Sequence, residues 1–126
     1  MGFMAKRKRV WFGYEGYGLG MEIALCAGFW SRLRGLVLSG PLGSRYGVLL
    51  APCSSIHTLG MGEPIEAVFL SKDLRVLKIS PPLKPWRGLS GCRGAWGVLE
   101  WQPGQASRLG LREGAQLNYI PRETTL

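Results

Sequence analysis

The residue types best suited to chemistry gather in residues 52–70, which hold the only histidine and one of the three cysteines of the chain. His57 could act as a base toward the thiol of Cys53, with Glu66 orienting the imidazole. Cys53, His57 and Glu66 are therefore the candidate catalytic set. No nucleophile signature surrounds Cys53, however, and two strand residues four apart do not touch unless the strand bends.

A soft-metal site is an alternative use of the same stretch. Cys53, His57 and Met61 are spaced four residues apart. Because side chains of a strand alternate between its two faces, an extended strand would present all three on one face. A thiolate, an imidazole and a thioether together suit Cu(I). Pro52 and Gly60 argue against an unbroken strand, and we expect no bound cofactor.

The simpler interpretation makes His57 a structural histidine, hydrogen-bonded to the backbone or to Glu66. In a similar structural role, Glu100 could anchor Arg32 or Arg87 as an ion pair.

A second interpretation is a binding module, in which Trp86 and Arg87 follow Pro85 and offer residue types common at interaction hot spots. The predicted binding residues are Arg32, His57, Met61, Trp86 and Arg87.

Length and composition limit the kinds of fold that the chain can form. A chain of 126 residues that is 46% apolar forms one domain with one core. Nineteen glycines and eight prolines favour short elements and tight turns, hence a β-rich architecture. The three cysteines form no C-x-x-C pair, which argues against a zinc knuckle, a thioredoxin motif or a disulfide framework.

No apolar run is long enough for a transmembrane helix. The basic N-terminus resembles the start of a signal peptide, but Glu15, Glu22 and several glycines interrupt the segment where an apolar stretch would be needed. The sequence therefore predicts a soluble, cytoplasmic protein.

Charge is concentrated near the N-terminus. The net charge is +8, and the block of four cations at residues 6–9 supplies half of it. Aromatic residues come directly after that block, so residues 1–20 are expected to form a flexible basic and aromatic arm. Such an arm could hold phosphates and stack on bases, which makes weak nucleic-acid binding a third alternative.

The remaining residues, 21–122, are expected to form one compact domain. Its predicted strands cover residues 21–27, 46–50, 65–70, 75–79, 94–101 and 115–120. Short helices are predicted at residues 29–38, with Ser31 as N-cap, and within residues 103–111, closed by Gly110. The fold class is mainly β (α+β), a small barrel-like domain with about two short helices.

An ordered series of short motifs carries a family resemblance. The series is Arg32-x-x-Gly35-Leu36, Pro52-Cys53-x-x-Ile56-His57-Thr58-x-x-Met61, Pro64-Ile65-x-x-x-Phe69-Leu70, Lys84-Pro85-Trp86-Arg87, Ala95-x-x-Val98-Leu99-Glu100 and Leu109-Gly110-Leu111-x-x-Gly114. It resembles the bacterial and archaeal domain of unknown function 192 over residues 24–120. The resemblance implies a compact, mostly β, barrel-like domain without an established activity. Many relatives are exported, which implies a periplasmic or extracellular alternative, and some accompany secretion or pilus systems.

Two positions depart from the family pattern. Gly62 stands where relatives usually carry a basic residue, and Glu66 stands where they usually carry aspartate. Together these observations predict a non-enzymatic module that binds a small ligand, a peptide or a protein partner. The alternatives are an enzyme or soft-metal site built on Cys53 and His57, and nucleic-acid binding through the arm.

Overall fold

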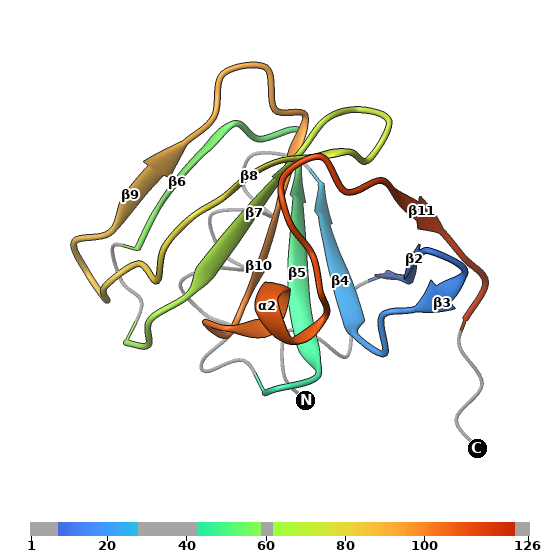
Figure 1. Cartoon of the computed structure of the whole chain (residues 1–126). Helices are drawn as coiled ribbons and strands as arrows, with labels where there is room; N and C mark the ends of the chain where they lie inside the picture. The colour runs from blue at the N-terminus through green and yellow to red at the C-terminus, as the bar shows by residue number, and fades with distance from the viewer. Residues whose placement is uncertain (1–7, 28–42, 59–61, 123–126) are drawn as a thin grey trace.

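A computed structural model describes residues 8–27, 43–58 and 62–122 (Figure 1). Its strands are β1 (Arg9–Val10), β2 (Phe12–Tyr14), β3 (Tyr17–Gly18), β4 (Glu22–Ala27), β5 (Tyr46–Ala51), β6 (Ser55–His57), β7 (Glu66–Leu70), β8 (Val76–Ile79), β9 (Leu89–Gly91), β10 (Gly97–Trp101) and β11 (Leu117–Tyr119). The helix α2 spans Gln105–Arg108. A six-stranded sheet has the order β1-β4-β5-β10-β7-β8, a three-stranded sheet the order β11-β2-β3, and β6 pairs with β9.

Two neighbouring inner strands of the large sheet, β7 and β10, are buried along their whole length. They pair antiparallel, with Val98 opposite Phe69 and Leu99 opposite Val68. Their nearly continuous apolar runs, rather than an alternation of apolar and polar residues, are typical of strands covered on both faces. The sheet must therefore have a covering layer on each side.

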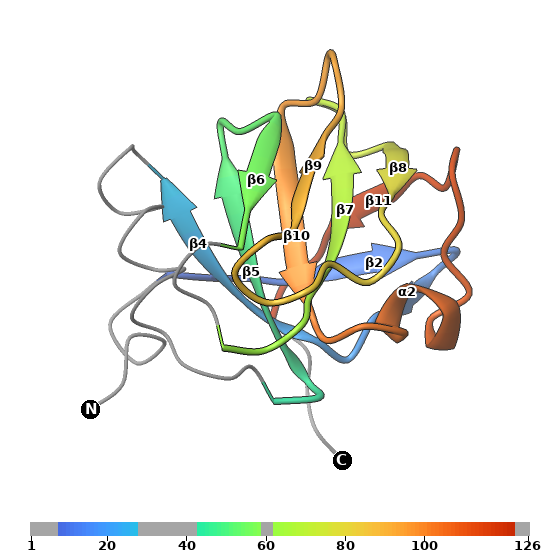
Figure 2. The same cartoon turned by 90° about the vertical axis from the view of Figure 1, so that its left-hand side faces the viewer.

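Each face of the sheet has its own core. Leu49, Val68, Leu99 and Trp101 belong to the first core, together with residues of β2, α2 and β11. The second core contains Val48, Phe69 and Val98 and includes Ile56 of β6. Figure 2 shows β6 and β9 in front of the large sheet, with β2 and β11 behind it. Because successive side chains of a strand point to opposite faces of the sheet, odd and even positions enter different cores.

The mainly β class is confirmed, and each of the six predicted strands overlaps an observed one. The strand expected from residue 94 begins only at Gly97, because Gly94 adopts a φ of 85° in a turn. The sheets do not close into a barrel in the described part of the chain, so the barrel-like form is not confirmed. Of the two predicted helices, α2 falls within residues 103–111, where Gly110 follows the C-cap with a φ of 73°. The helix expected at residues 29–38 lies outside the described residues.

The N-terminal segment differs from the expected arm. Residues 9–18 contain three strands, and the side chain of Phe12 is 1% exposed in the first core. Arg9, a member of the basic block, pairs with Glu22 of β4 at 3.2 Å. Glycines and charges obscure the hydrophobic periodicity of these strands, yet Phe12, Leu19 and Met21 supply enough apolar surface to hold the segment. In the described ranges, no helix has the length and apolar character needed to cross a bilayer.

Replacing Phe12 by alanine tests whether the N-terminal strands belong to the folded unit. We expect the free energy of unfolding to fall by about 3–5 kcal/mol, the usual cost of deleting a buried phenylalanine side chain. Denaturant unfolding followed by circular dichroism measures it. The control is Tyr17→Ala, which removes a ring that is 80% exposed and should change stability by less than about 0.5 kcal/mol. Equal, small effects of both variants would mean that the segment contributes nothing to the fold.

Candidate functional site

Glu66, a predicted catalytic residue, is a buried acceptor at the start of β7. Its side chain is 6% exposed and points to the first core. One oxygen, Oε2, accepts hydrogen bonds from Trp101 Nε1 at 2.6 Å and from the Ala106 amide at 2.9 Å. The other, Oε1, accepts one from the Gly104 amide at 3.2 Å. Because amides at the N-terminus of α2 lack partners within the helix, this carboxylate caps the helix from outside.

Cys53 and His57 lie on the other side of the sheet. Cys53 is half-buried against the second core, where its thiol donates to the Ser55 carbonyl over 3.1 Å and its amide donates to Trp96. His57 ends β6 and is exposed. Glu66 is held at the first core, so the structure does not bring it to His57. Cys53 precedes β6 and His57 ends it, four positions later, a reach of at most about 14 Å of chain.

The other predicted site residues divide into two groups. Arg32 and Met61 lie outside the described residues. Trp86 and Arg87 are described, and both are exposed. Across the described ranges, no three His, Cys, Asp or Glu side chains gather closely enough to hold a metal ion. The predicted soft-metal set therefore stays a prediction, because its third member, Met61, is not described.

The turn at residues 84–88, called the Trp86 turn below, is clamped by one buried residue. Thr58 Oγ1 donates to the Lys84 carbonyl at 2.6 Å and accepts from the Gly88 amide at 2.7 Å. Its backbone adds two more hydrogen bonds, one from its own amide to the Gly88 carbonyl and one to its carbonyl from the Trp86 amide, each 3.0 Å. Thr58 is fully buried. Four hydrogen bonds to one residue fix the shape of the turn.

The clamped turn has an unusual backbone at two positions. Trp86 has a φ of 69°, the left-handed region that is costly for a bulky side chain. Gly88 has no room for a side chain, since a Cβ there would lie 2.8 Å from Leu83 Cβ and 2.9 Å from the Lys84 carbonyl oxygen. The residue with this strained backbone, Trp86, is 60% exposed. An unfavourable conformation that exposes a large apolar side chain points to a function outside folding.

An exposed leucine lies next to the turn. Leu89 of β9 is 75% exposed and pairs with His57 of β6. Their neighbours Ile56 and Ser90 are buried, so His57 and Leu89 both point outward. Trp86 and Leu89 are three positions apart, a reach of at most about 11 Å of chain. We call the set His57, Lys84, Trp86, Arg87 and Leu89 the Trp86 surface. Sequence reasoning missed Leu89, because no strand was predicted at residues 89–91.

Basic residues predominate in the part of the chain that carries this surface. Residues 74–99 contain five basic residues and no acidic one. Lys84, Arg87 and Arg93 are exposed, and Lys78 Nζ donates to the Gly91 carbonyl of β9 at 2.8 Å. One carboxylate lies nearby: the exposed Glu63 is two residues before Ile65, which pairs with Leu83. Cations therefore outnumber carboxylates around two exposed apolar side chains.

A second buried carboxyl has a different environment from Glu66. Glu100 of β10 is 1% exposed, and neither of its side-chain oxygens has a hydrogen-bond partner in the described part of the chain. Its sheet neighbours in the register, Val48 and Ala67, are both apolar. Burial alone raises the pKa of Glu100 from 4.5 to about 8. The ion pair expected from sequence with Arg87 is absent, whereas Arg32 is not described.

Comparison with known proteins gives the family. The DUF192 family, described as an uncharacterized ACR, matches residues 14–119. The chain belongs to the DUF192 family. The match begins at the last residue of β2 and covers strands β3 to β11, α2 and the Trp86 turn. No curated protein matches this DUF192 chain.

Two solved structures share the fold of this DUF192 domain. One is described as a candidate transcription regulator from Sinorhizobium meliloti 1021, with a TM-score of 0.77 and 19% identity over 90% of this chain and 93% of that one. The other is a protein of unknown function from Novosphingobium aromaticivorans DSM 12444, with a TM-score of 0.76 and 21% identity over 89% of this chain and 84% of that one. At these identities the similarity establishes the fold alone.

Removal of the Glu66 carboxylate should destabilise the protein strongly. In Glu66→Ala the Trp101 indole and two backbone amides lose their acceptor, at an expected cost of about 2–5 kcal/mol in the free energy of unfolding. Chemical denaturation measures the loss, and Glu63→Ala, which removes an exposed carboxylate three residues earlier, is the matched control. A loss no larger than that of the control would show that the carboxylate does not hold α2.

Glu100 should make stability fall as pH rises. Between pH 4.5 and about 8 the unfolded chain has released this proton while the folded chain retains it. The free energy of unfolding should then decline by up to about 1.4 kcal/mol per pH unit in that window. Glu100→Gln should flatten the profile measured by denaturation at a series of pH values, whereas Glu113→Gln, at an exposed position, should not. A wild-type profile that rises over this window, or is unchanged in Glu100→Gln, would contradict the assignment.

Proposed function

We propose that this DUF192 domain is a protein-binding module that takes an acidic, partly apolar segment of a partner on the Trp86 surface. The observation that carries the proposal is the Trp86 turn itself, in which four hydrogen bonds to Thr58 support a strained backbone and an exposed indole. Nothing in the packing of the described residues requires that indole to face solvent. A turn fixed in advance loses little conformational entropy on binding.

Side-chain chemistry supports a peptide rather than a nucleic acid as the occupant. Trp86 and Leu89 offer an aromatic ring and an aliphatic side chain, which together suit an apolar anchor residue of a partner. Lys84 and Arg87 flank them and favour carboxylates beside that anchor. A surface for single-stranded nucleic acid would instead present several rings on which successive bases stack.

The family adds a biological setting to the proposal. Because some relatives accompany secretion or pilus systems, we extend the proposal to a partner that belongs to such an assembly. The binding surface and its chemistry do not depend on that setting.

The test is selection from a random peptide library followed by affinity measurement. The wild-type protein should enrich peptides with a large apolar residue next to Asp or Glu, and a selected peptide should bind saturably by fluorescence polarisation. Trp86→Ala with Leu89→Ala should weaken that peptide by about 30-fold or more, the effect of losing a hot spot. Tyr46→Ala, which removes an exposed ring on β5, is the control.

A second pair of variants separates the shape of the turn from its side chains. Thr58→Val removes the hydroxyl that clamps the turn, whereas Thr58→Ser keeps it. We expect the valine variant to weaken the selected peptide and the serine variant to bind it nearly as the wild type does. Failure to enrich acidic peptides, or equal binding by the Trp86 and Leu89 double variant, would contradict the proposal. Retention on nucleic acid that disappears in Trp86→Ala would replace it with nucleic-acid binding.

A further inference from the structure

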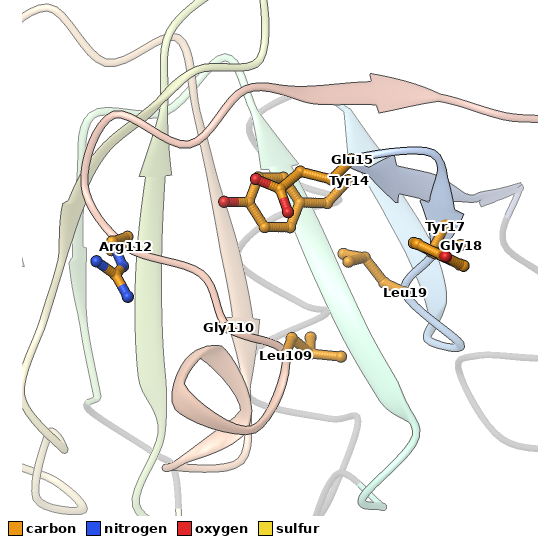
Figure 3. Close-up of a pocket in the computed structure, with 8 residues that line it drawn as sticks. All are labelled: Tyr14, Glu15, Tyr17, Gly18, Leu19, Leu109, Gly110 and Arg112. Carbon is orange, nitrogen blue, oxygen red and sulfur yellow. The ribbon is translucent and has the colours of Figure 1, made fainter.

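A pocket separate from the Trp86 surface lies between the β2–β3 hairpin and the chain after α2 (Figure 3). Its volume is about 480 Å³, within the range of small-molecule sites. The hairpin contributes Tyr14, Glu15, Tyr17, Gly18 and Leu19, and the chain after α2 contributes Leu109, Gly110 and Arg112. The two segments are about 90 residues apart in sequence.

The pocket combines an apolar part with aromatic hydroxyls. Leu19 is buried in the first core and Leu109 packs against that core, so both can contact an aliphatic group. Tyr14 is half-buried, whereas Tyr17 is exposed. In Figure 3 Leu19 and Leu109 point toward each other, Arg112 lies on the left of the view, and Tyr17 lies on the right. An aliphatic side chain could therefore fill the base of the pocket while polar groups meet the phenols.

Two opposite charges line the pocket without neutralising each other. Neither Glu15 nor Arg112 forms an ion pair within the described part of the chain. Glu15 also occupies an unusual backbone position, since the hairpin turn gives it a φ of 52° and Gly16 a φ of 84°. Asparagine, aspartate or glycine is the usual choice at such a position. A glutamate there keeps a carboxylate at the pocket at some cost in backbone energy.

We propose that this pocket binds a small zwitterion with an aliphatic side chain, of the amino acid or short-peptide class. Glu15 would pair with the ammonium group, Arg112 with the carboxylate, and Leu19 and Leu109 would contact the side chain. The proposal is independent of the Trp86 surface, which lies on the opposite covering layer and shares no residue with the pocket.

The experiment titrates the protein with three dipeptides while NMR follows the methyl groups of Leu19 and Leu109. Leucyl-leucine carries both terminal charges, N-acetyl-leucyl-leucine lacks the ammonium group, and leucyl-leucine amide lacks the carboxylate. Free leucine is titrated beside them to distinguish an amino acid site from a dipeptide site. Each titration is repeated with Glu15→Gln and Arg112→Gln, and with Glu113→Gln as a control for an exposed carboxylate beside Arg112.

The two variants should show opposite selectivities. Glu15→Gln should weaken leucyl-leucine and its amide by about two- to fivefold, as expected for exposed ion pairs, and leave the acetylated peptide unchanged. Arg112→Gln should weaken leucyl-leucine and the acetylated peptide by a similar factor and leave the amide unchanged. Saturable shifts with this crossed pattern would support the proposal.

Three other outcomes would overturn it. The first is the absence of saturable shifts with leucine and with every dipeptide. The second is binding that neither variant changes, which would indicate an apolar pocket without charge recognition. The third is binding weakened by Arg112→Gln alone, which would indicate an anion site.

Discussion

Burial of the central strands on both faces is the constraint on which the structure depends. Every residue of β7 and β10 is buried, so any polar side chain on these strands must find a partner inside the protein or remain uncharged. Glu66 meets the requirement with three donors and thereby connects β7 to Trp101 and α2. Glu100 has no such donors among the described residues, and burial therefore favours its protonated form. Two glutamates on neighbouring buried strands thus have opposite electrostatic environments.

The same constraint leaves both proposed binding sites to the covering layers. Side chains of the central strands are occupied by packing, whereas the Trp86 turn and the β2–β3 hairpin lie at the periphery. Both peripheral sites rest on residues that are themselves buried, Thr58 for the turn and Leu19 for the pocket. Each exposed group is therefore positioned by the packed interior rather than by neighbours on the surface.

The sequence predicted the large sheet well, because its strands are compact apolar runs separated by glycine, proline and charged residues. It failed for β1 to β3, where glycines and cations dilute the apolar signal and Phe12 supplies the burial. For the candidate site, Trp86 and Arg87 were predicted as binding residues from their residue types, and both are exposed in the structure. The grouping of Glu66 with His57 was not realised, because parity sends Glu66 to the first core while β6 packs on the second. Which core a residue faces depends on pairing between strands far apart in the sequence, and the spacing of neighbouring residues does not encode that pairing.

The clamp on the Trp86 turn has a consequence for how such a domain can diversify. Thr58 holds the turn only through backbone atoms, namely the carbonyls of Lys84 and Gly88 and the amides of Trp86 and Gly88. Side chains at positions 84, 86 and 87 can therefore change without loss of these hydrogen bonds, whereas positions 58 and 88 are restricted by chemistry and by space. The residues that hold the turn and the side chains that the turn exposes are therefore different. Under the proposed function, this separation would let new partner specificities evolve on an unchanged scaffold, and it makes the turn a suitable place to graft designed recognition sequences.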